Sequence, residues 1–378
     1  MSNILITGGA GFVGSHTARA LLNEGHRVRI VDLLDPQIHG KSGTFPATLD
    51  RRVDRVKGDI RRVNVLKATL DGVDAVYHFA AKTGVGQSMY DWSDYVDTNV
   101  GGTAALFQTL SRLKRPIQRV ILSSSRAIYG EGLARCAQHG MVQPPARKRL
   151  DMDRGEFQVR CPRCYRFVVS VPTMENAKAQ PASLYALSKK HQEDLALQAV
   201  AAFDTPVVIL RYFNVFGSCQ SLRNPYTGVV TVFFNRIRQG KNIALYEDGA
   251  PTRDFVHVSD VVRANVAALN YQGKPGEIFN VGSGRAITIK QLAVGLGKAM
   301  GHAACMEQTG EFRVGDIRAC TADLTRSRKK LGYHPQTTIE KGLEEFVTWA
   351  KKEAGPAGSY EKTVRELRQH RLFGRANQ

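Results

Sequence analysis

The sequence predicts an α/β protein in which a doubly wound parallel sheet is joined to a smaller C-terminal lobe. Up to about residue 130, short apolar segments such as 75–79 and 120–122 alternate with helical patterns, which is typical of parallel strands joined by crossover helices. The segment 207–210 resumes this pattern after a long interruption. Beyond Gly217 the strands become shorter and the composition changes, which predicts a separate lobe. A chain of 378 residues is long enough to bury a core in both parts.

The first predicted strand, residues 3–6, runs directly into a glycine-rich turn that an amphipathic helix follows. Glycines at these positions allow a tight turn, close approach of the backbone to a pyrophosphate, and close packing of the helix on the strand. The helix N-terminus then faces the phosphates. The predicted contacts are Gly8, Gly11, Phe12, Val13 and Gly14. This pattern predicts a Rossmann-type dinucleotide site.

The second predicted strand, residues 27–31, ends at Asp32. An acidic side chain about 20 residues past the glycine turn can accept both hydroxyls of an adenosine ribose and would repel a 2′-phosphate. We therefore expect NAD rather than NADP. Asp59 and Ile60 follow the next strand, where Asp59 could reach the adenine; a plain turn explains Asp59 nearly as well.

Tyr185 and Lys189 are one helical turn apart on the same face of a predicted helix. A tyrosine ordinarily loses its proton near pH 10, but a cation beside it favours the phenolate and can bring its pKa into working range. The spacing alone is weak, because a packed ring beside a solvated amine also produces it. Together with the nucleotide loop, the pair predicts a proton-transfer site.

The formal net charge of +19 invites a nucleic-acid interpretation. We do not favour it, because the basic residues are scattered and lack the interleaved aromatic residues that would stack bases. A solvated basic surface, or steering of a dianionic substrate, explains the charge instead. No apolar run approaches the roughly 20 residues that span a bilayer, and the N-terminus shows no signal-peptide pattern. We expect no membrane partner and a cytoplasmic location.

The stretch 131–180 fits neither part and predicts an insert. It carries Cys136 and His139, and then Cys161 and Cys164, with two residues between the members of each pair. This is the spacing of a tetrahedral zinc ribbon with three sulfur ligands and one nitrogen ligand, which is a structural site. A reversible disulfide between Cys161 and Cys164, or cysteines without a role, are the alternatives. Six cysteines are too few for a disulfide framework in a chain of this size.

Motifs along nearly the whole chain resemble the extended short-chain dehydrogenase/reductase family, and more narrowly its nucleotide-sugar epimerase/dehydratase branch. They are the glycine loop, Asp32, residues 78–81, residues 99–103, residues 123–125, the Tyr185/Lys189 pair, residues 211–217 and residues 253–258. The resemblance implies that Ala80, Ala81 and Asn99 also line the NAD site. It further implies that Ser125 and Tyr185 share one substrate oxygen and that Lys189 holds the nicotinamide ribose.

The two residues after Ser125 distinguish between reactions in this branch. Family dehydratases carry an Asp-Glu pair there to eliminate water, whereas this chain has Arg126 and Ala127. A guanidinium does not give up its proton at neutral pH, and alanine has none to give. Dehydration is therefore disfavoured, and the resemblance implies a redox-neutral 4-epimerase that holds NAD tightly.

The resemblance also implies a nucleotide-sugar substrate. Asn214, Arg253 and Arg313 would lie near the diphosphate, and Tyr246 would support the base; arginine suits a diphosphate because it binds in a bidentate way. The Cys/His insert, residues 84–90 and residues 224–228 look most like the subgroup of 4-epimerases that act on dTDP-6-deoxyhexoses such as dTDP-L-rhamnose. The alternatives are a UDP-sugar 4-epimerase, another nucleotide-sugar oxidoreductase or decarboxylase, and a basic zinc-ribbon protein that binds RNA. By analogy alone we expect a homodimer.

These interpretations divide the chain into five predicted segments. They are the NAD-binding core (1–130), the insert (131–180), the catalytic helix with the return to the core (181–217), the main part of the substrate lobe (218–350), and a basic tail (351–378). We expect short strands near 243–246 and 278–281 in the substrate lobe. We expect the tail beyond Gly355 to fray.

Overall fold

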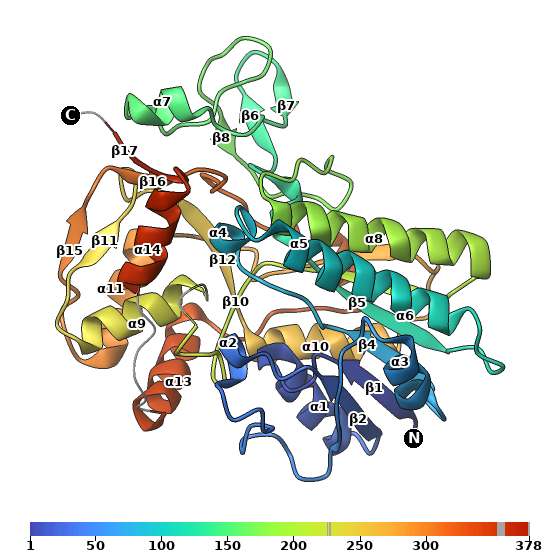
Figure 1. The fold of residues 1–378 in the computed structure, drawn as a ribbon. Coiled ribbons are helices and arrows are strands. Elements are labelled where there is room, and N and C mark those ends of the chain that lie inside the picture. The colour runs from blue at the N-terminus through green and yellow to red at the C-terminus, as the bar shows by residue number, and fades with distance from the viewer. Residues whose placement is uncertain (225, 227, 354–359, 377–378) are drawn as a thin grey trace.

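The alternating apolar segments form a seven-stranded parallel sheet with the strand order β13-β9-β5-β4-β1-β2-β3 (Figure 1). The structure, a computed structural model, describes residues 1–224, 226, 228–353 and 360–376. The strands are β1 (Asn3–Thr7), β2 (Arg27–Asp32), β3 (Asp54–Lys57), β4 (Ala75–His78), β5 (Arg119–Ser125), β9 (Val207–Tyr212) and β13 (Glu277–Val281). The predicted doubly wound α/β fold is confirmed.

Helices cover both faces of this sheet. One face carries α1 (Phe12–Asn23) and α10 (Val258–Leu269), and the other carries α3 (Val63–Leu70), α6 (Gly102–Leu110) and α8 (Leu184–Phe203). Along β1 the side chains alternate, so that Ile4 and Ile6 enter the first core and Leu5 enters the second. Strands buried on both faces need continuous apolar runs, which is why these segments could be predicted.

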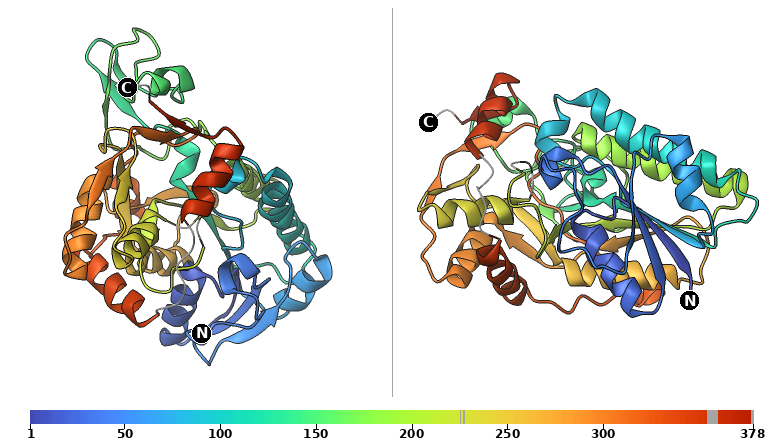
Figure 2. Two further views of the ribbon diagram at one scale, coloured as in Figure 1. Left: turned by 60° about the vertical axis from the view of Figure 1, so that its left-hand side comes forward. Right: turned by 60° about the horizontal axis from the view of Figure 1, so that its bottom comes forward.

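A smaller lobe adjoins the sheet (Figure 2). It contains β10 (Asn214–Phe216), α9 (Val229–Arg238), β11 (Ile243–Leu245), β12 (Thr252–His257), β14 (Ala286–Thr288), α11 (Ile289–Met300), β15 (Met306–Gln308) and α13 (Ile339–Lys352). Phe216, Phe234 and Phe346 lie in its core. One expectation was wrong: β13 belongs to the main sheet, where Ile278 pairs in register with Ile209. A strand of five residues does not reveal which strand lies beside it.

The insert projects from the body of the molecule (Figure 1). It holds a small antiparallel sheet of β7 (Gly140–Val142), β6 (Ala134–Cys136) and β8 (Val169–Ser170), and a short helix, α7 (Arg149–Asp153). Buried Arg147 anchors the insert, because its guanidinium pairs with Glu131 at 2.9 Å and with Glu247 of the lobe at 2.8 Å. The predicted insert is thus a small subdomain tied to the substrate lobe.

Part of the predicted basic tail is folded rather than frayed. Residues 360–369 form α14 (Tyr360–Gln369), and β17 (Phe373–Arg375) pairs antiparallel with β16 (Glu311–Arg313). Tyr360, Thr363 and Leu367 recur at helical spacing and lie against the lobe. Residues 354–359 and 377–378 of the predicted tail lie outside the described residues. In the described part of the chain, none of the helices has the length and apolar character needed to cross a membrane.

Candidate active site

The predicted nucleotide loop connects β1 to α1 and has room only for glycine at two positions. A Cβ atom at Gly8, where φ is +68°, would lie 2.7 Å from the backbone nitrogen of Ala80. A Cβ atom at Gly14 would lie 2.5 Å from the carbonyl oxygen of Gly8. Gly11, which precedes α1, makes no side-chain cap, so the first amides of the helix remain available to a ligand. This cradle fits a pyrophosphate.

Asp32 lies buried beside this loop at the end of β2. Its carboxylate accepts hydrogen bonds from the backbone amides of Ala10, at 3.0 Å, and Leu34, at 2.9 Å. A carboxylate has further lone pairs, so it can still accept ribose hydroxyls. Asp59 is less suited to a ligand, because both of its oxygens bond to the guanidinium of Arg61 at 2.7–3.0 Å.

The predicted proton-transfer pair lies at the start of α8, which Ser183 caps by accepting the amide of Ala186. Lys189 is fully buried, and its ammonium donates to the carbonyl of Ser123 at 3.0 Å. Burial lowers the pKa of Lys189 to about 7. Asn99 holds α8 against the loop after β4, because its amide accepts from the backbone of Lys82 at 2.7 Å and donates to Ser188 at 2.9 Å.

The phenol of Tyr185 is influenced by two neighbours that follow each other at the end of β5. Burial raises the pKa of Tyr185, whereas hydrogen bonding to Ser125 and the positive charge of Arg126 lower it. The positive charge of Arg126 thus acts in the direction that we predicted for Lys189, whose own effect on the phenol stays a prediction. From the sequence, Arg126 was weighed only as a proton donor, which it cannot be, and its electrostatic influence on Tyr185 was not predicted.

A cavity of about 240 Å³ lies next to Arg126, between α9, β11, β12 and α14. Four predicted substrate residues line it: Asn214, Tyr246, Arg253 and Arg313. The side-chain oxygen of Asn214 is buried without a hydrogen-bond partner among the described residues, so a ligand that donates a hydrogen bond would satisfy it. Ser125 and Tyr185 are not part of this lining, but Arg126 connects the cavity to them.

The cavity carries a surplus of positive charge. The carboxylate of Asp316 pairs with Arg253 at 2.6 Å and with Arg313 at 3.5 Å. Although burial acts in the opposite direction, the charges of Arg253, Arg313 and Arg126 hold the pKa of Asp316 well below its usual range. The guanidinium of Arg313 also lies over the ring of Tyr246, 5.1 Å from its centroid. The lining holds four guanidinium groups against the carboxylates of Glu247 and Asp316, and this surplus of two positive charges suits a dianionic ligand.

Helix α14 closes the cavity, which was not predicted from the sequence. Tyr360, Thr363, Val364 and Leu367 line the cavity from this helix. The carboxylate of Glu366 accepts hydrogen bonds from the hydroxyls of Tyr90, at 3.1 Å, and Tyr226. His370 stacks on the ring of Tyr90 at 4.4 Å between centroids. The helical spacing of residues 360, 363, 364 and 367 was the available signal, but the many charges around it obscured the pattern.

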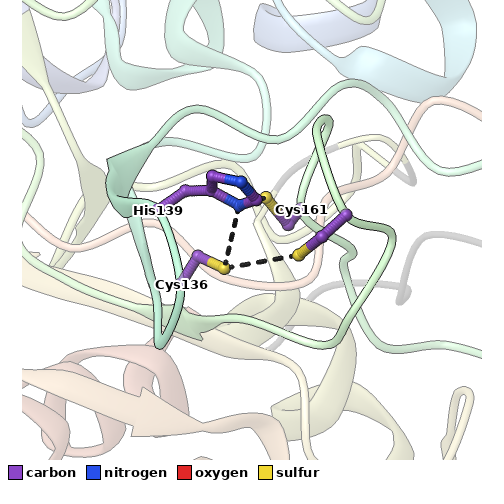
Figure 3. Close-up of side chains that lie close together, drawn as sticks. Cys136, His139 and Cys161 are labelled. Atoms are coloured by element: carbon purple, nitrogen blue, oxygen red, sulfur yellow. Dashed lines mark hydrogen bonds between the residues drawn. The ribbon is translucent and has the colours of Figure 1, made fainter.

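The four predicted zinc ligands come together in the insert (Figure 3). The sulfur of Cys136 lies 3.7 Å from Nδ1 of His139 and 3.6 Å from the sulfur of Cys164, and the sulfur of Cys161 lies 3.5 Å from the same Nδ1. Around a tetrahedral zinc ion, two sulfurs are separated by about 3.8 Å, and a sulfur and a nitrogen by about 3.6 Å. The donor set and its spacing therefore fit zinc.

Comparison with known proteins gives the same family as the motifs. The family described as "NAD dependent epimerase/dehydratase family" matches residues 4–147 and 168–282. Residues 148–167, between the two matched ranges, lie within the insert. A dTDP-L-rhamnose 4-epimerase of Burkholderia thailandensis is 35% identical and covers 93% of this chain and 95% of its own length. A UDP-N-acetyl-alpha-D-glucosaminuronate decarboxylase of Bacillus cytotoxicus is 30% identical, over 92% of this chain and 97% of its own.

Solved structures resemble the whole fold as well. The UDP-glucuronic acid 4-epimerase of Bacillus cereus, in complex with UDP-glucuronic acid and NAD, has a TM-score of 0.76 at 26% identity. The alignment covers 93% of this chain and 100% of the other. The UDP-glucose 4-epimerase of Thermotoga maritima, with UDP-glucose, has a TM-score of 0.75 at 29% identity, with coverage of 93% and 99%.

Proposed function

We propose a function from the family to which this chain belongs, the NAD dependent epimerase/dehydratase family. The proposed function is that of a redox-neutral nucleotide-sugar 4-epimerase with tightly bound NAD. One observation carries the proposal. Arg126, which acts on the phenol of Tyr185, lines a positively charged cavity, and the acid–base pair of a dehydratase is absent from positions 126 and 127. The chain can thus move a proton at a sugar hydroxyl but lacks the groups that would eliminate water.

In this proposal Tyr185 takes the proton from the sugar 4-hydroxyl and later returns it, while the Ser125 hydroxyl bonds to the same oxygen. When bound, NAD supplies the acceptor for the hydride and gives the hydride back. Lys189 would hold the nicotinamide ribose, since its buried ammonium has only one hydrogen bond in the described part of the chain. The other assigned NAD contacts are Gly8, Gly11, Phe12, Val13, Gly14, Asp32, Ile60, Ala80, Ala81 and Asn99, with Asp59 the weakest of the set.

We infer that the substrate is a dTDP-6-deoxyhexose such as dTDP-L-rhamnose, in keeping with the relative from Burkholderia thailandensis. Arg253 and Arg313 would bind the diphosphate, with Asn214 nearby and Tyr246 beside the base. A UDP-sugar 4-epimerase is the second candidate, because it would use the same groups and because solved UDP-sugar 4-epimerases align over 93% of this chain.

The direct test is a panel of dTDP- and UDP-sugars incubated with the purified protein without added NAD, with the products identified by NMR. We expect bound nicotinamide in the purified protein and interconversion of one pair of 4-epimers. Stoichiometric build-up of NADH, or release of carbon dioxide, would favour the oxidoreductase or decarboxylase alternative. RNA binding that weakens with salt and survives Tyr185→Phe, with no sugar turned over, would favour the non-enzymatic alternative.

We further propose that Cys136, His139, Cys161 and Cys164 bind a structural zinc ion, which would stabilise an insert that buries few apolar residues. Metal analysis should find about one zinc per chain in the wild type and in Cys305→Ser, an exposed cysteine outside the insert. It should find almost none in Cys161→Ser. A disulfide between Cys161 and Cys164 in the metal-free wild type would instead favour the redox alternative.

The homodimer and the cytoplasmic location remain proposals. We infer a dimer interface along α6 and α8, because Leu187 and Leu197 of α8 and neighbouring Trp92 are exposed apolar side chains. Light scattering should give twice the chain mass for the wild type and a smaller mass for the double variant Leu187→Glu, Leu197→Glu. An unchanged mass in that variant would contradict the interface.

A further inference from the structure

Arg126 differs from the other arginines of the cavity. It begins η2 (Arg126–Tyr129), the short turn after β5, and lines the cavity. Arg253 and Arg313 both pair with Asp316, and Arg236 pairs with Glu361. No described residue forms a hydrogen bond or an ion pair with the guanidinium of Arg126.

An unpaired guanidinium is unfavourable at this position. Arg126 is half-buried; arginine keeps its charge in proteins, and even partial removal of a charge from water without a partner is costly. Desolvation here lowers the pKa of Arg126, and so does the neighbouring charge of Arg253. Asp316, a carboxylate close enough to act on Arg126, is already shared by two other arginines. An anionic group of a ligand would compensate the charge.

The location of Arg126 limits which group that is. Arg126 follows Ser125 in the chain and acts electrostatically on the phenol of Tyr185, at the proposed reaction centre, and it is also close enough to Arg253 to feel its charge. An oxyanion beside Arg126 therefore belongs to the sugar end of the substrate, between the reacting carbon and the diphosphate guanidinium groups. Two groups of a nucleotide sugar meet this condition: the phosphate attached to the sugar, and a carboxylate carried by the sugar.

We propose that Arg126 is a specificity-determining residue that binds an oxyanion at the sugar end of the substrate. The identity of the ligand as a nucleotide sugar rests on the proposed function. The planar fork of arginine matches both phosphate and carboxylate, because each presents two oxygens to two N–H groups. Ala127, the next residue, carries no carboxylate that would compete for the guanidinium.

Calorimetry on the full-length, NAD-loaded protein tests this proposal. The ligands are a nucleoside diphosphate, its glucose ester and its glucuronate ester, as a thymidine set and a uridine set. The variants are Arg126→Ala, Arg126→Lys and Arg285→Ala, an exposed arginine outside the cavity that serves as the control. If the phosphate is the partner, Arg126→Ala should weaken all three ligands by about ten- to a hundredfold. If the carboxylate is the partner, only the glucuronate ester should weaken by that factor.

The proposal is overturned if Arg126→Ala binds all three ligands within twofold of the wild type. If that variant does not fold, Arg126→Lys decides, because it keeps the charge but not the fork. A loss of at least about fivefold is then expected, and unchanged affinity overturns the proposal. A wild type that binds neither set removes the proposed function together with this inference, whereas a wild type that turns over a sugar while Arg126→Ala binds normally removes this inference alone.

Discussion

Replacing Glu366 by alanine should loosen the helix that closes the substrate cavity. The carboxylate of Glu366 is three-quarters buried and accepts the hydroxyls of Tyr90 and Tyr226, which attach α14 to the cavity wall. A hydrogen bond to a charged group contributes roughly 1.5–3 kcal/mol. Because both phenols are half-buried and can recover hydrogen bonds to water, we expect a net loss of about 2 kcal/mol for the pair.

A loss of that size corresponds to about a thirtyfold increase in the open population of α14, since about 1.4 kcal/mol is a factor of ten. Amide hydrogen exchange in residues 361–369 should accelerate by that factor, and the nucleotide-sugar Kd should rise. Glu344→Ala on the exposed face of α13 removes a comparable side chain that bonds to none of the residues described in α14, so exchange in α14 should not change. Acceleration below about threefold in Glu366→Ala would refute the reasoning.

Three further predictions concern the core of the site. Tyr185→Phe should lower kcat by about 10²- to 10⁴-fold while the nucleotide-sugar Kd stays within about threefold; an equal loss of binding would make Tyr185 a binding residue only. Lys189 has a folded pKa of about 7 against an ordinary 10.5, so its burial destabilises the cofactor-free fold fully below pH 7, and this effect disappears as the pH rises toward 10.5. Lys189→Met should therefore raise the free energy of unfolding below pH 7 and leave it unchanged near pH 10.5. If urea titrations show the same gain in this free energy at both pH values, burial of the charged ammonium is not its cause. Glu193→Gln should lower the free energy of unfolding by about 3–5 kcal/mol, because Glu193 pairs with buried Arg211 at 2.7 Å, whereas Asp194→Asn, on the exposed side of the same helix, should change it little.

The parts of the fold that could be predicted are those in which a local pattern has one physical explanation. The buried parallel strands need unbroken apolar runs, and β1, β5 and β9 carry them. The glycine loop was predictable for a related reason, since the close approach of Gly8 to Ala80 tolerates no side chain. The paired ligand spacing of the insert likewise brought four donor atoms within reach of one ion.

The missed features depend on contacts between distant residues. The position of β13 is decided by its neighbour β9 and not by its own residues. The role proposed for Arg126 follows from Asp316, far along the chain, which Arg253 and Arg313 share, so that Arg126 has no ion pair with any residue that the structure describes. From the sequence, residues 360–369 were predicted to belong to a basic tail. Their apolar stripe can be interpreted only when the cavity that it covers is known.

Because helix α14 lies near the C-terminal end of the chain, the segments of the substrate cavity are completed later in synthesis than those of the cofactor site. The residues assigned to NAD all precede residue 190, whereas the cover of the substrate cavity begins at Tyr360. Protein chains emerge from the ribosome N-terminus first, so the segments assigned to the cofactor emerge long before the helix that completes the substrate site. A chain cut near residue 353 would keep every NAD residue and lose α14 and β17. Such a shortened chain should lose affinity for the nucleotide sugar but still hold nicotinamide.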